Sequence, residues 1–210
     1  PRSRCPHCNH LIRAWENIPV LSYLFLGGKC HACGHPISIR YPLVELLSAV
    51  LVTTVAWKFG VTEQAALAIV LTWALVSLTF IDLDHRIIPD VISLPGIPLF
   101  FLGSLAVASV TILDSVIGIL IGGGTLYLLA WGYETLKGRE GMGGGDIKLL
   151  AMIGAWMGYT ALPYIILISS LTGIIIGGGS LLLTKKDFGN RIPFGPFLVL
   201  GTLMNLFFQI

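Results

Sequence analysis

The sequence predicts an all-α polytopic membrane protein with a small cysteine-rich N-terminal domain. Of the 210 residues, 55% are hydrophobic and 11% are charged, and the mean hydropathy is +0.85. A water-soluble domain has about 25% charged residues, so this chain has too few to cover a water-facing surface. All four cysteines lie within residues 1–40, and the composition becomes apolar from Tyr41 onward. We therefore expect one domain over residues 1–40 and a transmembrane domain over residues 41–210.

Seven apolar segments follow residue 40, at about residues 42–58, 64–81, 91–110, 113–133, 147–159, 161–183 and 194–210. A helix needs roughly 20 apolar residues to span a bilayer. The fifth segment is shorter, so we expect it to be tilted or to pair closely with the sixth. Pro95 and Pro98 predict a kink in the third segment. The sequence opens at Pro1 without a signal-peptide pattern, and we expect one further helix, an eighth, in the full protein.

The basic residues predict the orientation in the membrane. With residues 1–40 in the cytoplasm and the segments alternating, every Lys and Arg except Lys58 falls on the cytoplasmic side. Cytoplasmic loops of membrane proteins carry an excess of Lys and Arg. This pattern indicates a multi-pass protein whose N-terminal domain faces the cytoplasm.

The cysteines form two C-x2-C pairs, "CPHC" at Cys5–Cys8 and "CHAC" at Cys30–Cys33, separated by 21 residues. Such spacing is typical of a structural zinc ion held by four thiolates. Two disulfides are the alternative, which a reducing cytoplasm disfavours. Four cysteines complete such a site, so we interpret the nearby histidines as surface residues: His7, His10, His31 and His35.

A glycine-rich stretch leads into one carboxylate. In "GMGGGDIKLL", Gly143, Gly144 and Gly145 precede Asp146 and an apolar run. Asp146 could be a simple helix N-cap. Glycines also permit positive φ and close approach of another backbone, so this stretch is a candidate substrate-binding segment.

A second acidic cluster, "FIDLDHRIIPD", lies on the same predicted membrane face. Asp82 follows a run from Ala74 to Ile81 that is apolar apart from Ser77 and Thr79. It should therefore lie at the hydrocarbon edge, where ionisable groups usually have a partner and a function. Asp90 follows Pro89 and is most simply an N-cap, and Asp84 lies between them. Asp82 and Asp146 together predict an aspartyl pair in which one carboxyl stays protonated and the other activates water.

The motifs resemble those of the type IV prepilin peptidases, which are bifunctional leader peptidases and N-methyltransferases of the GxGD type of aspartic protease. The matching stretches are the two C-x2-C pairs, "ENIPVLSYL", "RYPLVELL", "FIDLDHRIIPD" and "GMGGGDIKLLAMIGAW". They occur in this order over essentially the whole chain.

The resemblance implies an enzyme of the bacterial inner membrane with its active site facing the cytoplasm. It implies cleavage of the basic leader from prepilins or pseudopilins of type IV pilus or type II secretion systems. It also implies methylation of the new N-terminal amine with S-adenosylmethionine. Asp82 and Asp146 match the catalytic aspartates, and the cysteines match the zinc ligands. The partners implied are prepilins and the lipid bilayer, with no nucleic acid and no indicated oligomeric state.

The methyl-transfer site has a weaker signature. The sequence has no Rossmann-type glycine fingerprint. We therefore expect the methyl donor to bind the zinc domain and its junction with the membrane. Candidate residues, from or beside the matching stretches, are Gly28, Glu16, Asn17 and Arg40, with Asp84 and Asp90 as candidates for attracting the substrate leader.

Two other functions fit part of the pattern. A membrane protease without methyltransferase activity would not need the intact stretch from "ENIP" to "RYPLVE". A transporter or metal-sensing protein would need acidic residues near the middle of its spans, whereas these lie near span ends.

Overall fold

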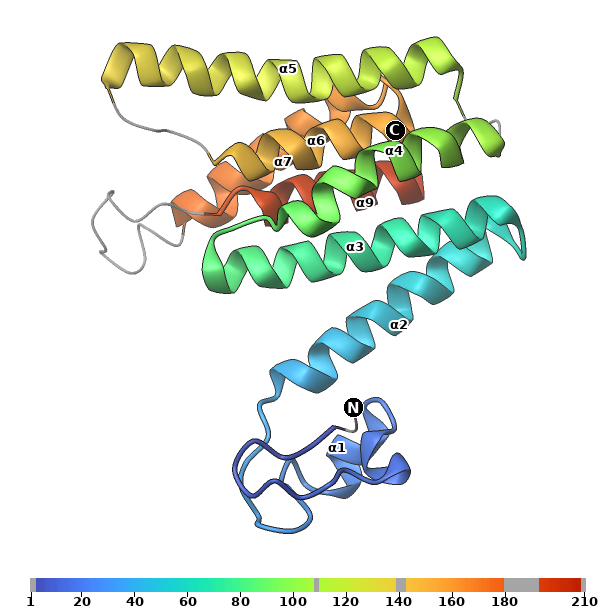
Figure 1. Ribbon diagram of the computed structural model, residues 1–210, viewed down its shortest axis with the longest axis vertical. Helices are drawn as coiled ribbons and strands as arrows, with labels where there is room; N and C mark the ends of the chain where they lie inside the picture. The colour runs from blue at the N-terminus through green and yellow to red at the C-terminus, as the bar shows by residue number, and fades with distance from the viewer. Residues whose placement is uncertain (1–2, 108–109, 139–142, 180–192, 209–210) are drawn as a thin grey trace. The chain divides into compact units, whose positions relative to one another are not determined.

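The computed structural model describes residues 3–107, 110–138, 143–179 and 193–208, and these form helices joined by loops (Figure 1). Within these ranges there are no strands, only two isolated β-bridges. The chain divides into two compact units, Pro1–Trp57 and Lys58–Ile210. Three of the described helices are long and apolar enough to cross a membrane, and several shorter apolar helices accompany them. The predicted all-α membrane fold is confirmed.

The first unit starts with two turns of the same design, one around each C-x2-C pair. Cys5 N–H donates to the carbonyl of His10 at 3.0 Å, and Cys30 N–H donates to that of His35 at 2.9 Å. A left-handed residue follows the second cysteine of each pair, Asn9 with φ 57° and Gly34 with φ 69°. The repeated geometry brings both cysteines of a pair to one side of a tight turn.

Two short helices and one long helix complete this unit. They are the 3-10 helix η1 (Ala14–Asn17), α1 (Leu21–Phe25) and α2 (Arg40–Phe59). The backbone N–H of Val20 donates to Glu45 Oε2 at 2.8 Å, so the loop before α1 is tied to the first turns of α2. The two units divide after Trp57, so most of α2 belongs to the N-terminal unit. The expected domain boundary after residue 40 stays a prediction.

The second unit consists of α3 (Glu63–His85), α4 (Asp90–Ala106), α5 (Ile112–Lys137), α6 (Gly144–Met157), α7 (Leu162–Thr172), the π-helical η2 (Gly173–Gly178) and α9 (Gly195–Phe208). With α2, these match the seven predicted segments. Helix α6 has 14 residues, about 21 Å at 1.5 Å per residue, less than the roughly 30 Å of a hydrocarbon core. The short fifth segment is therefore confirmed. Helix α4 continues through Pro95 and Pro98.

Helix α6 is the centre of this unit, where it packs against α4, α5 and α9 (Figure 1). Its closest neighbour is α5. A Cβ added at Gly118 would lie 2.3 Å from the carbonyl oxygen of Gly154, and one added at Gly154 would lie 2.2 Å from that of Gly118. Ser115 Oγ also donates to the carbonyl of Ala155 at 2.6 Å. Only glycine allows the two backbones to approach this closely.

The up-and-down topology brings four helix ends together. The C-terminal end of α3 and the N-terminal ends of α4, α6 and α9 lie at the same end of the second unit (Figure 1). Asp82 is in the last turn of α3 and Asp146 in the first turn of α6. The fold thus brings the two predicted carboxylates to one place.

Candidate active site and metal centre

Asp82 and Asp146 are buried at adjoining helix ends. Asp82 is 5% exposed and Asp146 is 8% exposed. Their charges lie close enough to act on each other. Two carboxylates in a low-dielectric environment cannot both ionise cheaply, so one proton is readily shared between them. The arrangement is that of an acid–base pair.

The walls around the pair come from the loop before α4 and from the start of α9. A Cβ added at Gly195 would lie 2.6 Å from Asp82 Oδ2 and 3.2 Å from Ile88 Cδ1. A Cβ added at Gly145 would lie 2.7 Å from Ile88 Cβ. Ile88 therefore fills the space between the two glycines and excludes water from one side of the carboxylates.

One oxygen of Asp82 has no ordinary structural role. Asp82 Oδ2 is buried and has no hydrogen-bond partner among the described residues, although the backbone N–H of Gly195 interacts with the carboxylate. A buried polar atom left unpaired costs about 1–3 kcal/mol. Such an atom in a native fold is a place for a substrate, a catalytic water or a shared proton.

The structure corrects two sequence-based interpretations of helix capping. The N-cap of α6 is Gly143, and Asp146 lies three residues inside the helix. The N-cap of α4 is Pro89, and Asp90 is the first helical residue. Neither aspartate is an N-cap, because Asp146 is the third residue of its helix and Asp90 is the first residue of its own. The capping explanation for Asp146 is therefore wrong.

The three glycines before Asp146 do not use their conformational freedom. None of Gly143, Gly144 and Gly145 has a positive φ. Nothing lies within 4 Å of a Cβ added at Gly143 or Gly144, and both residues are exposed. Gly145 instead permits the contact with Ile88. The space beside Gly143 and Gly144 leaves room for an extended substrate next to Asp146.

The two outer aspartates differ in their surroundings. Asp84 is exposed in the last turn of α3. Asp90 forms an ion pair with Lys148, with Oδ1 and Nζ 2.6 Å apart, which joins the first turns of α4 and α6. The charge of Asp90 is thus partly offset by a partner within the fold.

The four cysteines come together in the N-terminal unit. The four sulfur atoms all lie within 4.8 Å of one another, and they belong to Cys5, Cys8, Cys30 and Cys33. Cys8 Sγ and Cys30 Sγ are 4.0 Å apart. Tetrahedral Zn–S bonds of about 2.3 Å put sulfurs roughly 3.8 Å apart. All four are free thiols, so the sulfurs fit one ion and the alternative of two disulfides has no support.

The backbone of the first turn favours a thiolate. The N–H groups of Cys8 and His7 lower the pKa of the Cys5 thiol to about 6, against the opposing effect of burial. The His10 N–H acts in the same direction on Cys8, but burial and the sulfurs of Cys33, Cys5 and Cys30 raise the pKa of Cys8 to about 12. A metal ion binds the deprotonated form of a cysteine, so metal binding at this cluster would be coupled to the loss of thiol protons.

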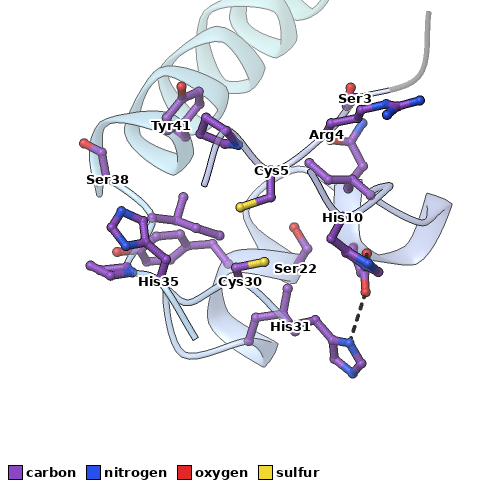
Figure 2. A pocket seen from close by; sticks show the side chains of 18 of the residues that line it. Ser3, Arg4, Cys5, His10, Ser22, Cys30, His31, His35, Ser38 and Tyr41 are labelled. Carbon is purple, nitrogen blue, oxygen red and sulfur yellow. Dashed lines mark ion pairs between the residues drawn. The ribbon is translucent and has the colours of Figure 1, made fainter. Parts of the chain in front are cut away.

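A cavity of about 420 Å³ opens beside the sulfurs of Cys5 and Cys30 (Figure 2). This is the size of a small-molecule site. Glu16 and Asn17 line it, as do Tyr23, Tyr41 and Glu45. Gly28 and Arg40, which the structure also describes, are not among the residues that line it. A Cβ added at Gly28, with φ +69°, would lie 2.9 Å from the phenol of Tyr23, so Gly28 shapes the cavity through that ring.

Comparison with known families matches both units. The bacterial peptidase A24 N-terminal domain matches residues 1–59, and the type IV leader peptidase family matches residues 69–178. The chain belongs to the type IV leader peptidase family.

Relatives support this membership over nearly the whole chain. The chain is 50% identical to the prepilin leader peptidase/N-methyltransferase of Aeromonas hydrophila, over 96% of this chain and 69% of the relative. It is 47% identical to the protein of the same name from Pseudomonas aeruginosa, over 96% of this chain and 69% of that relative. The protein of that name from Dichelobacter nodosus is 45% identical, again over 96% of this chain and 69% of that relative. No solved structure matches the chain.

Membership confirms the family and the enzyme class expected from the motifs, a membrane protease that also transfers a methyl group. The relatives are named as both peptidases and N-methyltransferases, which disfavours a protease without methyltransferase activity. Neither match supports a transporter or a metal sensor.

Sequence reasoning missed two residues of these sites. Gly195 abuts Asp82, and its only sequence signal was a glycine just before a proline at a helix start, "FGP". Tyr23 lines the cavity and abuts Gly28, and its only sequence signal was its place in the matching stretch "ENIPVLSYL".

The contact between Gly195 and Asp82 leads to a prediction. We expect Gly195→Ala to reduce prepilin-peptide cleavage by about 10²-fold, because a displaced catalytic group loses its reactive geometry. Gly132→Ala in α5, where nothing lies within 4 Å of the added Cβ, is the control and should cleave normally. The rates are measured on purified proteins in detergent, and equal rates for both variants would contradict the assigned geometry.

Proposed function

We propose that this chain is a membrane aspartic endopeptidase that removes the basic leader from type IV prepilins or pseudopilins and then methylates the new N-terminus. The observation that carries the proposal is the pair of buried carboxylates, Asp82 and Asp146, at adjoining helix ends within the peptidase unit.

The pair performs the cleavage by acid–base chemistry. One carboxylate takes a proton from a water molecule while the water oxygen attacks the scissile carbonyl carbon. The protonated partner carboxyl donates a proton to the carbonyl oxygen. Collapse of the tetrahedral intermediate breaks the C–N bond as the leaving nitrogen takes a proton. The products are a leader with a new carboxylate and a prepilin with a free amine. The two acid–base roles belong to the pair as a unit.

The substrate's own chemistry fits this location. The apolar helix of a prepilin lies in the bilayer beside the spans, while the scissile bond reaches the helix ends near Gly143 and Gly144. The exposed Asp84 and the ion-paired Asp90 add negative charge near the site, which attracts a basic leader. The excess of Lys and Arg on one side supports an orientation in which the N-terminal domain and the carboxylate end face the cytoplasm, with the protein in a bacterial inner membrane.

A structural zinc ion held by Cys5, Cys8, Cys30 and Cys33 stabilises the N-terminal unit in this proposal. The distance between the sulfurs of Cys8 and Cys30 suits a tetrahedral thiolate site. A unit of this size has little hydrophobic core of its own, so a metal contributes directly to its folding.

The cavity beside the cysteines is the proposed site of methyl transfer. S-adenosylmethionine supplies a methyl group activated by a positive sulfur. The cavity offers aromatic rings from Tyr23 and Tyr41 and carboxylates from Glu16 and Glu45, which suit an aromatic, cationic molecule. Of the four residues expected to bind the donor, Glu16 and Asn17 line the cavity, and Gly28 acts on its wall.

The first prediction from the proposed function tests the aspartyl pair. We expect Asp82→Asn and Asp146→Asn each to lower prepilin cleavage by about 10²–10⁴-fold, because shape is kept and the ionisable group is lost. The double variant should be scarcely worse than either single one, since residues acting as a unit are non-additive. Asp84→Asn should lose much less. Cleavage is measured by sequencing the N-terminus of the product. Near-normal cleavage by the Asp146→Asn variant would contradict the aspartyl-pair mechanism.

The second prediction separates the two activities. Gly28→Ala should impair transfer of a labelled methyl group while prepilin cleavage persists, because the added Cβ displaces Tyr23 at the cavity wall. Gly27→Ala is the matched control. Gly27 also has a positive φ, +58°, but nothing lies within 4 Å of its added Cβ. Equal loss of methyl transfer in both variants would indicate backbone strain rather than a shaped cavity.

The third prediction concerns the cysteines. Cys30→Ser should abolish tight metal binding at the thiolate site and destabilise the N-terminal unit, because metal binding and folding are coupled there. Limited proteolysis reports unfolding, and protection of the remaining thiols from a thiol reagent reports the metal. Unchanged thiol protection in the variant would refute the assignment.

A further inference from the structure

A second group of metal-ligand side chains lies in the N-terminal unit. His10, Glu16 and His31 each offer one ligand atom, and these atoms lie within 4.8 Å of one another. His10 Nε2 is 3.4 Å from Glu16 Oε2, and His31 Nδ1 is 3.5 Å from Glu16 Oε1. The two imidazoles lie on the same side of the cavity (Figure 2).

These distances suit a bridging cation better than direct hydrogen bonds. An N–H···O hydrogen bond is 2.7–3.2 Å long, shorter than both separations. Zinc bound to nitrogen and oxygen at about 2.1 Å puts tetrahedral neighbours roughly 3.4 Å apart. The nitrogen–oxygen separations, 3.4 Å from His10 Nε2 to Glu16 Oε2 and 3.5 Å from His31 Nδ1 to Glu16 Oε1, are close to that edge length. Each imidazole thus faces a different oxygen of the carboxylate.

Two of the ligand atoms are buried and make only the long ion-pair contacts given above. The Glu16 side chain is 4% exposed, and within the described ranges neither Glu16 Oε1 nor His10 Nε2 has a hydrogen-bond partner. This corrects the interpretation of His10 as a surface residue. Leaving such atoms unpaired is costly, and one cation would satisfy both.

The carboxylate is already held in place for such a role. The backbone N–H of Arg13 donates to Glu16 Oε2 at 2.8 Å. That bond lowers the pKa of Glu16 despite the opposing effect of burial, and His10 and His31 act in the same direction. Metal-binding carboxylates are commonly oriented by a hydrogen bond of this kind.

We propose that His10 Nε2, the Glu16 carboxylate and His31 Nδ1 bind a second zinc ion, separate from the one at the four cysteines. Two imidazoles and a carboxylate are a ligand set that binds zinc in proteins. All three residues line the cavity, so the ion forms part of its wall. It also joins three segments of the unit: the turn after the first cysteine pair, η1, and the second cysteine pair.

The test counts zinc in the untagged, purified chain. Equilibrium dialysis against micromolar zinc should give about two ions per chain for the unaltered protein and about one for His31→Ala and for His10→Ala. In both variants the cysteine thiols should stay protected from a thiol reagent, which shows that the four-cysteine site persists. His35→Ala is the matched control, because His35 stacks on His7 outside the cluster, and it should keep two ions.

Three outcomes would overturn the proposal. The first is a single zinc ion per chain in the unaltered protein. The second is a His31→Ala variant that binds as many zinc ions as the unaltered protein, and the third is a His35→Ala variant that loses one ion. X-ray absorption of the zinc-saturated, unaltered protein decides the case if a variant unfolds. A mixture of sulfur and nitrogen or oxygen neighbours is expected, and sulfur alone would contradict the second site. None of these readouts depends on either enzymatic activity.

Discussion

The contact between the backbones of α5 and α6 is the constraint on which the peptidase unit depends. At Gly118 and Gly154 each added Cβ would meet the other helix's carbonyl oxygen at 2.2–2.3 Å. In lipid the hydrophobic effect does little to join helices, so close packing of small residues and hydrogen bonds must do so. Ser115 supplies one such bond to Ala155. This contact holds a helix too short to span a bilayer by itself, and that helix carries Asp146 at its first turn.

Glycines also allow close packing around the two carboxylates, because they have no side chain to occupy the space. Gly145 admits Ile88, and Gly195 admits Asp82. These contacts close the space around the pair, so the carboxylates are buried although they lie at helix ends where water is near. Burial makes proton sharing favourable, while the open side at Gly143 and Gly144 leaves access for a substrate. One packing principle thus provides both the position and the environment of the pair.

Hydropathy and motif spacing predicted most of the fold, including the seven helices, the short fifth one and the cysteine turns. Each depends on neighbours along the chain. The sequence did not predict contacts between distant segments. Gly195 follows Asp82 by more than a hundred residues, and no local pattern links them. The contact between Gly145 and Ile88 was missed for the same reason, because it has no signature in "GGGD". His10 seemed superfluous beside four cysteines, since spacing alone does not show that its nitrogen is buried against Glu16.

The two reactions must follow in a fixed order, because the amine that accepts the methyl group does not exist before the leader is removed. An amine attacks a methyl donor only through its free lone pair, so the cavity needs a group that accepts a proton from the amine. Glu16 and Glu45 are the carboxylates in the described lining. If Glu16 serves a metal ion, Glu45 remains for this role. One oxygen of Glu45 already accepts the N–H of Val20 at 2.8 Å, which holds this carboxylate at the cavity.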